Sequence, residues 1–133
     1  MFATVTRDEL SVWVEAYERA WRTPGTDTLR TLFAEDASYQ TAPYLEPYHG
    51  LAAIEELWER ERDGPDERFK LRWEIVAVEA DTGVVRTGVR YEEPRRDFRN
   101  IWIVRFDRSG RCVAFEEWFF TPPGDRNLEA VTK

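Results

Sequence analysis

FRNIWIVRFDRSGRCVAFEEWFFT, residues 98–121, is the stretch that decides the fold. Two runs rich in β-branched and aromatic residues flank the tetrapeptide Asp107-Arg108-Ser109-Gly110, whose glycine suits a short turn. This pattern predicts a long antiparallel hairpin. Neither face of the hairpin is plainly polar, which is typical of a sheet covered on both sides. We expect the chain's own helices on one face and a second subunit on the other.

Two polar residues interrupt the apolar rows of this hairpin. Asn100 lies in a row whose other members are Phe98, Trp102, Val104 and Phe106, and Glu117 lies in a row with Val113, Phe115 and Phe119. An apolar environment disfavours the charged form of an acid, which raises its pKa and suits it to acid–base chemistry. Alternatively, Glu117 pairs with Arg86, Arg90 or Asn100 in a structural network.

The residues before position 65 are patterned as helices and loops. Thr6 and Glu9 fit a helix-start capping box, and apolar residues then recur at helical spacing over residues 7–22, ending at Pro24-Gly25. The pattern predicts a second helix over 27–34, a short strand over 37–42 and a loop from Pro43 to Gly50. A third helix is expected from Leu51 to the stop at Asp63-Gly64-Pro65.

The remainder of the chain is rich in strands. Residues 69–77 and 85–92 alternate between apolar and polar side chains around a turn at Asp81-Thr82-Gly83, and a charged loop over 93–97 leads into the long hairpin. Pro122-Pro123 ends the last strand. We therefore expect one domain over 1–121 and a C-terminal tail over 122–133, and we expect the part of the tail beyond Pro123 to be dispensable for folding.

Composition limits the classes of function. The chain has 133 residues, 26 acids and 19 bases, and a formal charge of −7, which argues against a nucleic-acid surface. Cys112 is the single cysteine, and we interpret it as a small buried apolar side chain in a strand. A chain with one cysteine has no internal disulfide, which is compatible with a cytoplasmic location. We expect no membrane span and no signal peptide. With His49 as the only histidine, we expect no metal site, and without a glycine-rich phosphate loop we expect no cofactor.

Helices first and a hairpin-linked sheet afterwards indicate an α+β fold. We expect a strongly curved, mainly antiparallel sheet that curls around the three N-terminal helices packed on it. The space between the first helix, the third helix and the concave face of the sheet would be a pocket. Its walls would be aromatic, because the chain has 6 Trp and 8 Phe.

The order of elements and three local motifs resemble the nuclear transport factor 2-like superfamily, in particular its bacterial SnoaL-like and ketosteroid isomerase-like branch. The motifs are Leu32-Phe33-Ala34-Glu35-Asp36-Ala37, Gly50 with Ala52-Ala53-Ile54, and the run from Phe106 to Phe119. The resemblance covers roughly Thr6 to Thr121 in one register. It implies the cone-shaped fold, a central pocket and a homodimer. Proteins of this fold include isomerases, cyclases, hydrolases, dehydratases and binding proteins.

The resemblance to ketosteroid isomerases carries over one functional position of three. Their oxyanion-hole tyrosine in the first helix matches Tyr17. Their general-base aspartate falls on Thr41, which is a poor proton acceptor. Their neutral acid in the penultimate strand falls on Trp102, whose indole offers an N–H and no titratable acid.

Other branches point to Glu117. It resembles in register the final-strand carboxylate of limonene-epoxide-hydrolase-like members, with Arg86 or Arg90 as the cation, although their Arg-x-Asp pattern is absent. It also resembles the pocket acid of SnoaL-like polyketide cyclases, whose usual histidine only His49 could approximate. A solvated loop histidine is the plainer interpretation of His49.

These patterns predict a protein that binds a small, apolar or aromatic molecule. A cofactor-free isomerase, polyketide cyclase-like or epoxide hydrolase-like enzyme is the alternative, and a protein-interaction adaptor is the third. For catalysis the candidates are Glu117 as acid and base and Tyr17 as hydrogen-bond donor. The candidate ligand-binding residues are Trp13, Trp21, Thr41, Trp58, Asn100, Trp102, Phe115 and Phe119.

Overall fold

The computed structural model describes residues 4–62, 68–92 and 95–123. Along the chain the elements are α1 (Arg7–Arg22), α2 (Leu29–Leu32), β1 (Phe33–Gln40), β2 (Tyr48–His49), α3 (Leu51–Glu61), β3 (Phe69–Glu79), β4 (Thr82–Glu92), β5 (Arg95–Phe106) and β6 (Cys112–Phe120). The predicted α+β class, with helices early and strands late, is confirmed.

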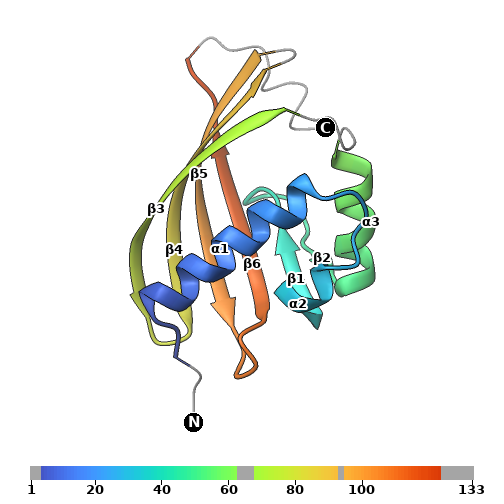
Figure 1. Cartoon of the computed structure of the whole chain (residues 1–133), viewed down its shortest axis with the longest axis vertical. Helices are drawn as coiled ribbons and strands as arrows, with labels where there is room; N and C mark the ends of the chain where they lie inside the picture. Colours follow the sequence, from blue (N-terminus) through green and yellow to red (C-terminus); the bar gives the residue numbers. More distant parts are fainter. Residues whose placement is uncertain (1–3, 63–67, 93–94, 124–133) are drawn as a thin grey trace.

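The strands form one six-stranded sheet in the order β2-β1-β6-β5-β4-β3. All neighbours are antiparallel except β1 and β6, which are parallel. In Figure 1, α1 crosses one face of the sheet diagonally and α3 lies beside β1. The sheet is twisted but not strongly curled, so the strong curvature expected from the sequence is not found.

Helix α1 begins and ends as the sequence predicts. Thr6 Oγ1 accepts a hydrogen bond from the Glu9 N–H at 3.1 Å, and Glu9 Oε1 accepts one from the Thr6 N–H at 2.9 Å. The helix lies close to the sheet at β4, because a Cβ atom on Gly83 would collide with Leu10 Cδ2. A glycine at position 83 therefore lets the fully buried Leu10 side chain reach the strand backbone.

The segment after α1 differs from the prediction. Helix α2 has four residues instead of the expected 27–34, and β1 begins at Phe33 instead of Ala37. The reason is pairing with the hairpin: Phe33 lies opposite Cys112 of β6, and its ring is 1% exposed. The predicted loop 43–50 also contains β2, whose residues Tyr48 and His49 pair with β1.

The hairpin of β3 and β4 is longer than predicted and turns earlier. Its turn is Ala80-Asp81, with Glu79 opposite Thr82, and Ala80 has a positive φ of 51°. The register shifts between Ile75 and Ala77 because Val76 is an extra residue in β3. Ala77 therefore leaves the inward row in which the alternation had placed it.

The predicted charged loop over 93–97 is also partly strand. β5 begins at Arg95, which lies opposite Glu92 of β4, and Arg96 lies opposite Tyr91. Positions 93 and 94 lie outside the described residues. So do the helix stop expected at Asp63-Gly64-Pro65 and the part of the tail from 124 onward.

The turn of the central hairpin is confirmed. Asp107 Oδ1 accepts hydrogen bonds from the N–H of Ser109 at 2.8 Å and the N–H of Arg111 at 3.1 Å. Gly110 takes a φ of 85°, which a residue with a side chain rarely adopts. The turn fixes the register of β5 against β6, and with it the face on which each side chain lies.

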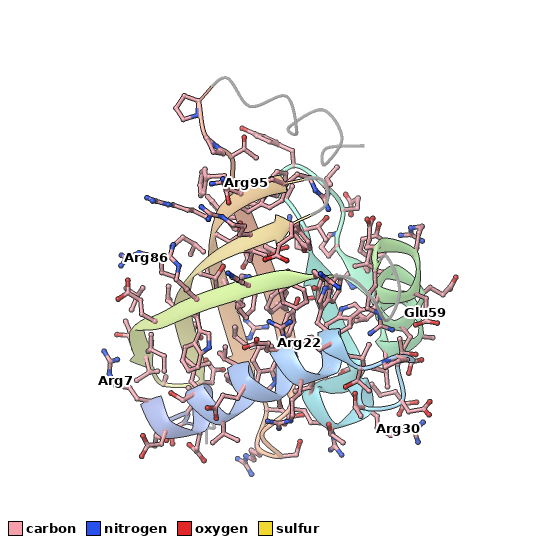
Figure 2. All side chains as sticks on the ribbon, turned by 45° about the horizontal axis from the view of Figure 1, so that its top comes forward. Arg7, Arg22, Arg30, Glu59, Arg86 and Arg95 are labelled. Atoms are coloured by element: carbon pink, nitrogen blue, oxygen red, sulfur yellow. The ribbon has the colours of Figure 1, made fainter. Side chains whose placement is uncertain are left out.

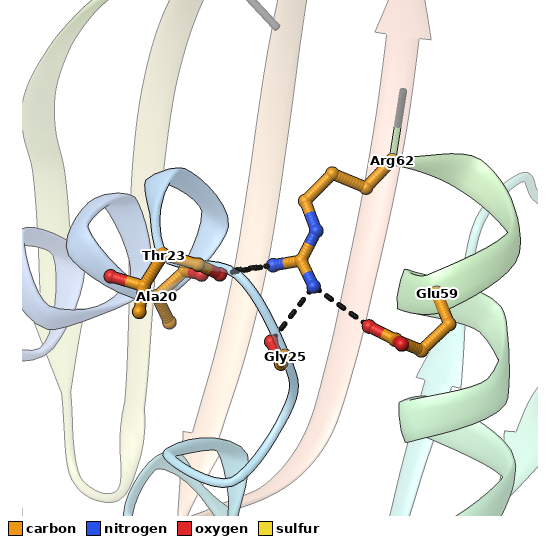
Figure 3. A network of polar contacts seen from close by, with 5 residues as sticks. All are labelled: Ala20, Thr23, Gly25, Glu59 and Arg62. Carbon is orange, nitrogen blue, oxygen red and sulfur yellow. Dashed lines mark hydrogen bonds and ion pairs between the residues drawn. The ribbon is translucent and has the colours of Figure 1, made fainter. Parts of the chain in front are cut away.

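One arginine ties the two long helices together (Figure 3). The Arg62 side chain, 5% exposed, donates to the carbonyl oxygens of Ala20, Thr23 and Gly25 at 3.1, 2.8 and 2.7 Å. It also donates to Glu59 Oε1 at 2.8 Å. The end of α3 thereby caps the last turn of α1 and the loop that follows it.

Candidate functional site

A cavity of about 680 Å³ opens between α1, α3, the loop after β1 and the inner face of the sheet. Much of its wall is aromatic, with rings from Tyr17, Trp21, Tyr39, Phe69, Tyr91, Phe98, Trp102 and Phe119. A cavity of this size holds a drug-sized molecule. The fold thus provides an aromatic-walled site to which both the helices and the sheet add charged groups: Glu18, Arg60, Glu61, Arg96 and Glu117.

Glu117 is the centre of the polar cluster in this cavity. It lies directly opposite Trp102 in the β5–β6 ladder, so both side chains point to the same face. Glu117 Oε2 accepts a hydrogen bond from Trp102 Nε1 at 2.9 Å and a longer one from Asn100 Nδ2 at 3.4 Å. The register predicted from the hairpin therefore points Glu117 into the cavity, where it lines the wall.

The surroundings of Glu117 raise its pKa above the usual value of a glutamate. Desolvation by burial is the main cause, and the hydrogen bond from Trp102 partly offsets it. A carboxyl group with a raised pKa can hold or release a proton closer to neutral pH than a solvated one.

Neither candidate arginine reaches Glu117. Arg86 pairs with Glu74 across the β3–β4 ladder, and Arg90 pairs with Asp97 at 2.8 Å. Both arginines belong to the outward-facing row of β4, and Figure 2 shows Arg86 pointing away from the sheet into solvent. Glu117 therefore has the environment of a desolvated acid and not that of an ion pair with Arg86 or Arg90.

Tyr17 meets a tyrosine that the sequence did not single out. The hydroxyl groups of Tyr17 and Tyr39 are 2.8 Å apart and share a hydrogen bond in which either can donate. Burial raises the pKa of both tyrosines, and the negative charge of Glu117 raises both further. In the strand predicted over 37–42, Tyr39 shares one side with Thr41, and this spacing was the one sequence signal that could have marked it as a wall residue.

The predicted ligand-binding residues divide into two groups. The cavity wall includes Trp21, Thr41, Asn100, Trp102 and Phe119. The hydrophobic core instead takes Trp13, Trp58 and Phe115, which are 5%, 1% and 0% exposed and do not line the cavity. Their burial has a physical reason: each of the three rings packs on both Tyr17 and Phe33, and Trp13 also packs on Phe115, at centroid distances of 5.0–6.5 Å.

The mouth of the cavity is lined by residues outside the predicted set. Tyr44 and Leu45, in the loop after β1, are exposed. Arg60 Nη2 donates to the Tyr48 hydroxyl at 3.1 Å across the opening. His49 is exposed and does not line the cavity, as expected of a solvated residue, but it lies in β2 and not in a loop.

Burial also raises the pKa of the Cys112 thiol, to about 12, so this cysteine is a packed side chain of the core. In the described ranges of the chain, no three His, Cys, Asp or Glu side chains lie close enough together to hold a metal ion. No helix in those ranges combines the length and the apolar character that a membrane span requires.

The fold is similar to those of solved bacterial proteins. A nuclear transport factor 2-like protein of unknown function from Burkholderia xenovorans matches with a TM-score of 0.68 and 18% identity, covering 92% of this chain and 91% of that chain. A proposed SnoaL-like polyketide cyclase from Jannaschia matches with a TM-score of 0.66 and 17% identity, covering 90% and 88%. A proposed ketosteroid isomerase from Parabacteroides distasonis matches with a TM-score of 0.59 and 14% identity, covering 82% of this chain and 86% of that chain.

At these identities the likeness establishes the fold alone. No curated protein shows a significant match to the sequence. The SnoaL-like domain, however, matches residues 14–115, which run from the middle of α1 through α3 and β3 to β5 and end at Phe115 of β6, two residues before Glu117. The chain therefore belongs to the SnoaL-like domain family and has the nuclear transport factor 2-like fold.

Proposed function

We propose that this protein binds a small, largely apolar or aromatic molecule in the cavity between α1, α3 and the sheet. The observation that carries the proposal is the combination of aromatic walls with one buried carboxyl cluster, Glu117 with Trp102 and Asn100. Binding sites for small organic molecules have this composition: mostly apolar surface, with a few polar groups that orient the ligand.

Two variants and one control test this proposal. Val89→Trp should fill part of the cavity that Val89 lines, whereas Val12→Trp adds the same ring on the exposed side of α1, where Val12 is 61% exposed. Native mass spectrometry of protein purified from its own host should show a small molecule bound to the wild type and to Val12→Trp. Val89→Trp should lose it. A cavity that never carries a ligand, or equal occupancy in both variants, would contradict the proposal.

Catalysis without a cofactor is the second candidate function, because Glu117 has a raised pKa and the Tyr17–Tyr39 hydroxyl pair lies near enough to feel its charge. In this case Glu117 acts as acid and base in an isomerisation, cyclisation or hydrolysis. Glu117→Gln should then leave capture of the molecule intact and abolish its conversion. The third candidate, a protein-interaction adaptor, would not need an aromatic cavity of this size.

We also propose a cytoplasmic homodimer that forms through the outer face of the sheet. Trp118 and Phe120 of β6 are 40% and 56% exposed there, beside the half-buried Ile101 and Ile103 of β5. Large apolar patches on a sheet face are typical of interaction surfaces.

Light scattering at micromolar concentration should give twice the chain mass of 15.8 kDa. Trp118→Arg should shift the protein to the monomer, while Tyr44→Arg, which changes a fully exposed tyrosine away from the sheet, should leave the dimer intact. A monomeric wild type would refute the dimer without affecting the proposed binding site.

A further inference from the structure

The N–H donors of Trp102 and Asn100, at the polar end of the cavity, are already in use. The Trp102 indole has a single N–H, and this N–H donates to Glu117 Oε2 at 2.9 Å. The Asn100 amide nitrogen faces the same carboxylate oxygen at 3.4 Å. These two groups are the N–H donors that β5 directs at Glu117. Both point at the carboxylate and not at the open space of the cavity.

The hydrogen-bond acceptors there are not in use. Asn100 is 6% exposed and lines the cavity, and its Oδ1 has no hydrogen-bond partner among the described residues. Rotating the amide by half a turn would not give Oδ1 a donor. It would exchange Oδ1 with the nitrogen and place two acceptors, Oδ1 and a Glu117 carboxylate oxygen, about 3.4 Å apart. A buried amide oxygen without a donor is unfavourable, so this atom is suited to a donor supplied by a ligand.

The charge at this end of the cavity also favours a ligand group that donates hydrogen bonds or is positively charged. Glu117 is a desolvated carboxyl group, and the two candidate arginines, Arg86 and Arg90, bind acids on the outer face. Of the arginines that line the cavity, Arg60 donates to the Tyr48 hydroxyl and Arg96 lies over the Tyr91 ring. The rings of Tyr17, Trp102 and Phe119 line the cavity with it. Aromatic faces and a carboxylate both attract cations.

Given the proposed binding function, we propose that the bound molecule carries a hydrogen-bond donor, an amine or a hydroxyl group, at its inner end, and presents it to Glu117 and Asn100. A carbonyl or carboxylate at that end would meet two acceptors and no available N–H from this pair. An amine fits better than a hydroxyl, because it has hydrogens for both acceptors and a positive charge opposite Glu117.

Four probes with one ring system test this inference: 1-naphthylmethylamine, 1-naphthalenemethanol, 1-naphthaldehyde and 1-methylnaphthalene. They share an apolar body and differ only in the group at the end. Isothermal titration calorimetry at pH 8 should rank the amine first and the alcohol second. We expect the amine to bind about tenfold or more tightly than the aldehyde, the difference of one hydrogen bond to a charged group.

Variants assign this preference to the two acceptors. Glu117→Gln should remove most of the advantage of the amine over the alcohol, because it deletes the charge and keeps the shape. Asn100→Leu should weaken the amine and the alcohol by roughly five- to tenfold and leave methylnaphthalene unchanged. Glu116→Gln is the matched control: its Oε1 accepts from the Trp118 indole at 3.3 Å on the opposite face of the same strand, and it should alter no affinity.

The outcomes separate this inference from the proposed function. If the aldehyde binds as tightly as the amine and the alcohol, or if Glu117→Gln retains the preference for the amine, the inference is wrong although the cavity binds small molecules. If none of the four probes binds, methylnaphthalene included, the proposed binding function fails and the inference fails with it.

Discussion

Replacing Glu117 with glutamine should make the protein more stable at neutral pH and leave its stability nearly unchanged at acidic pH. The folded protein raises the pKa of this carboxyl above its value in the unfolded chain, chiefly by desolvation. The folded state therefore binds the proton more tightly than the unfolded state does. Binding of this proton contributes to the free energy of unfolding. The contribution is fully present below about pH 4, near the pKa of a glutamate in the unfolded chain, and it is lost as the pH rises through the raised pKa of the folded protein.

Glutamine resembles the protonated acid at every pH, so the variant does not lose this contribution. Its amide oxygen can still accept the hydrogen bond that Trp102 donates at 2.9 Å to Glu117. The expected gain in the free energy of unfolding at pH 7 is about 1.4 kcal/mol for each unit by which the pKa is raised. Chemical denaturation of both proteins between pH 4 and pH 8 measures it as a difference that grows with pH.

Glu116→Gln serves as the control for this prediction. Its side chain lies one residue earlier on β6, bonded to the outward Trp118, so the same chemical change occurs on the opposite face of the sheet. We expect it to change stability by less than about 0.5 kcal/mol. A Glu117→Gln variant that is less stable than wild type at pH 7 would show that the carboxylate holds β5 and β6 together, and the desolvation argument would be wrong.

Arg62→Ala should destabilise the protein by about 2–4 kcal/mol, a loss of roughly 10 °C in melting temperature for a chain of this size. The guanidinium is 5% exposed and makes four hydrogen bonds, three of them to carbonyl oxygens at the end of α1 and in the loop that follows (Figure 3). Alanine leaves these oxygens and Glu59 without this donor, and it leaves a void between the helices.

Two further variants make this prediction specific. Arg62→Lys keeps the charge but cannot present the same fork of donors, so it should lose an intermediate amount of stability. Arg60→Ala removes an exposed arginine two residues away, whose bond to the Tyr48 hydroxyl is 3.1 Å long, and should cost at most about 1 kcal/mol. Equal melting temperatures for the Arg60 and Arg62 variants would contradict the role assigned to this network.

The central hairpin could be predicted from the sequence because its signals are local. Alternation along β5 and β6 and the turn at Asp107 to Gly110 fix which side chains share a face, and the structure places Asn100, Trp102 and Glu117 together as that register requires. The capping box of α1 is local in the same way. Such signals depend on neighbours within a few residues, so a single sequence contains them in full.

The extent of α2 and β1 could not be predicted from neighbours along the chain. Residues 33 and 34 read as the end of a helix, but Phe33 joins the sheet because it pairs with Cys112, which is far away in sequence. The bulge at Val76 likewise depends on how β3 pairs with β4 and could not be predicted from neighbouring residues. Pairing between distant segments overrides weak local preference, and nothing in the local pattern records it.

The sequence by itself determined the α+β class, the inward register of Glu117 and the supply of aromatic side chains. Only the tertiary structure decided which of those side chains form the core and which line the cavity. Trp13, Trp58 and Phe115 lie in the core, and Tyr39 and Tyr91 lie on the wall, because helix packing on a twisted sheet fills one part of the concave face and leaves another part open. The structure also decided that Arg86 and Arg90 pair with outward acids, so that Glu117 is a desolvated carboxyl group and not half of an ion pair with either arginine.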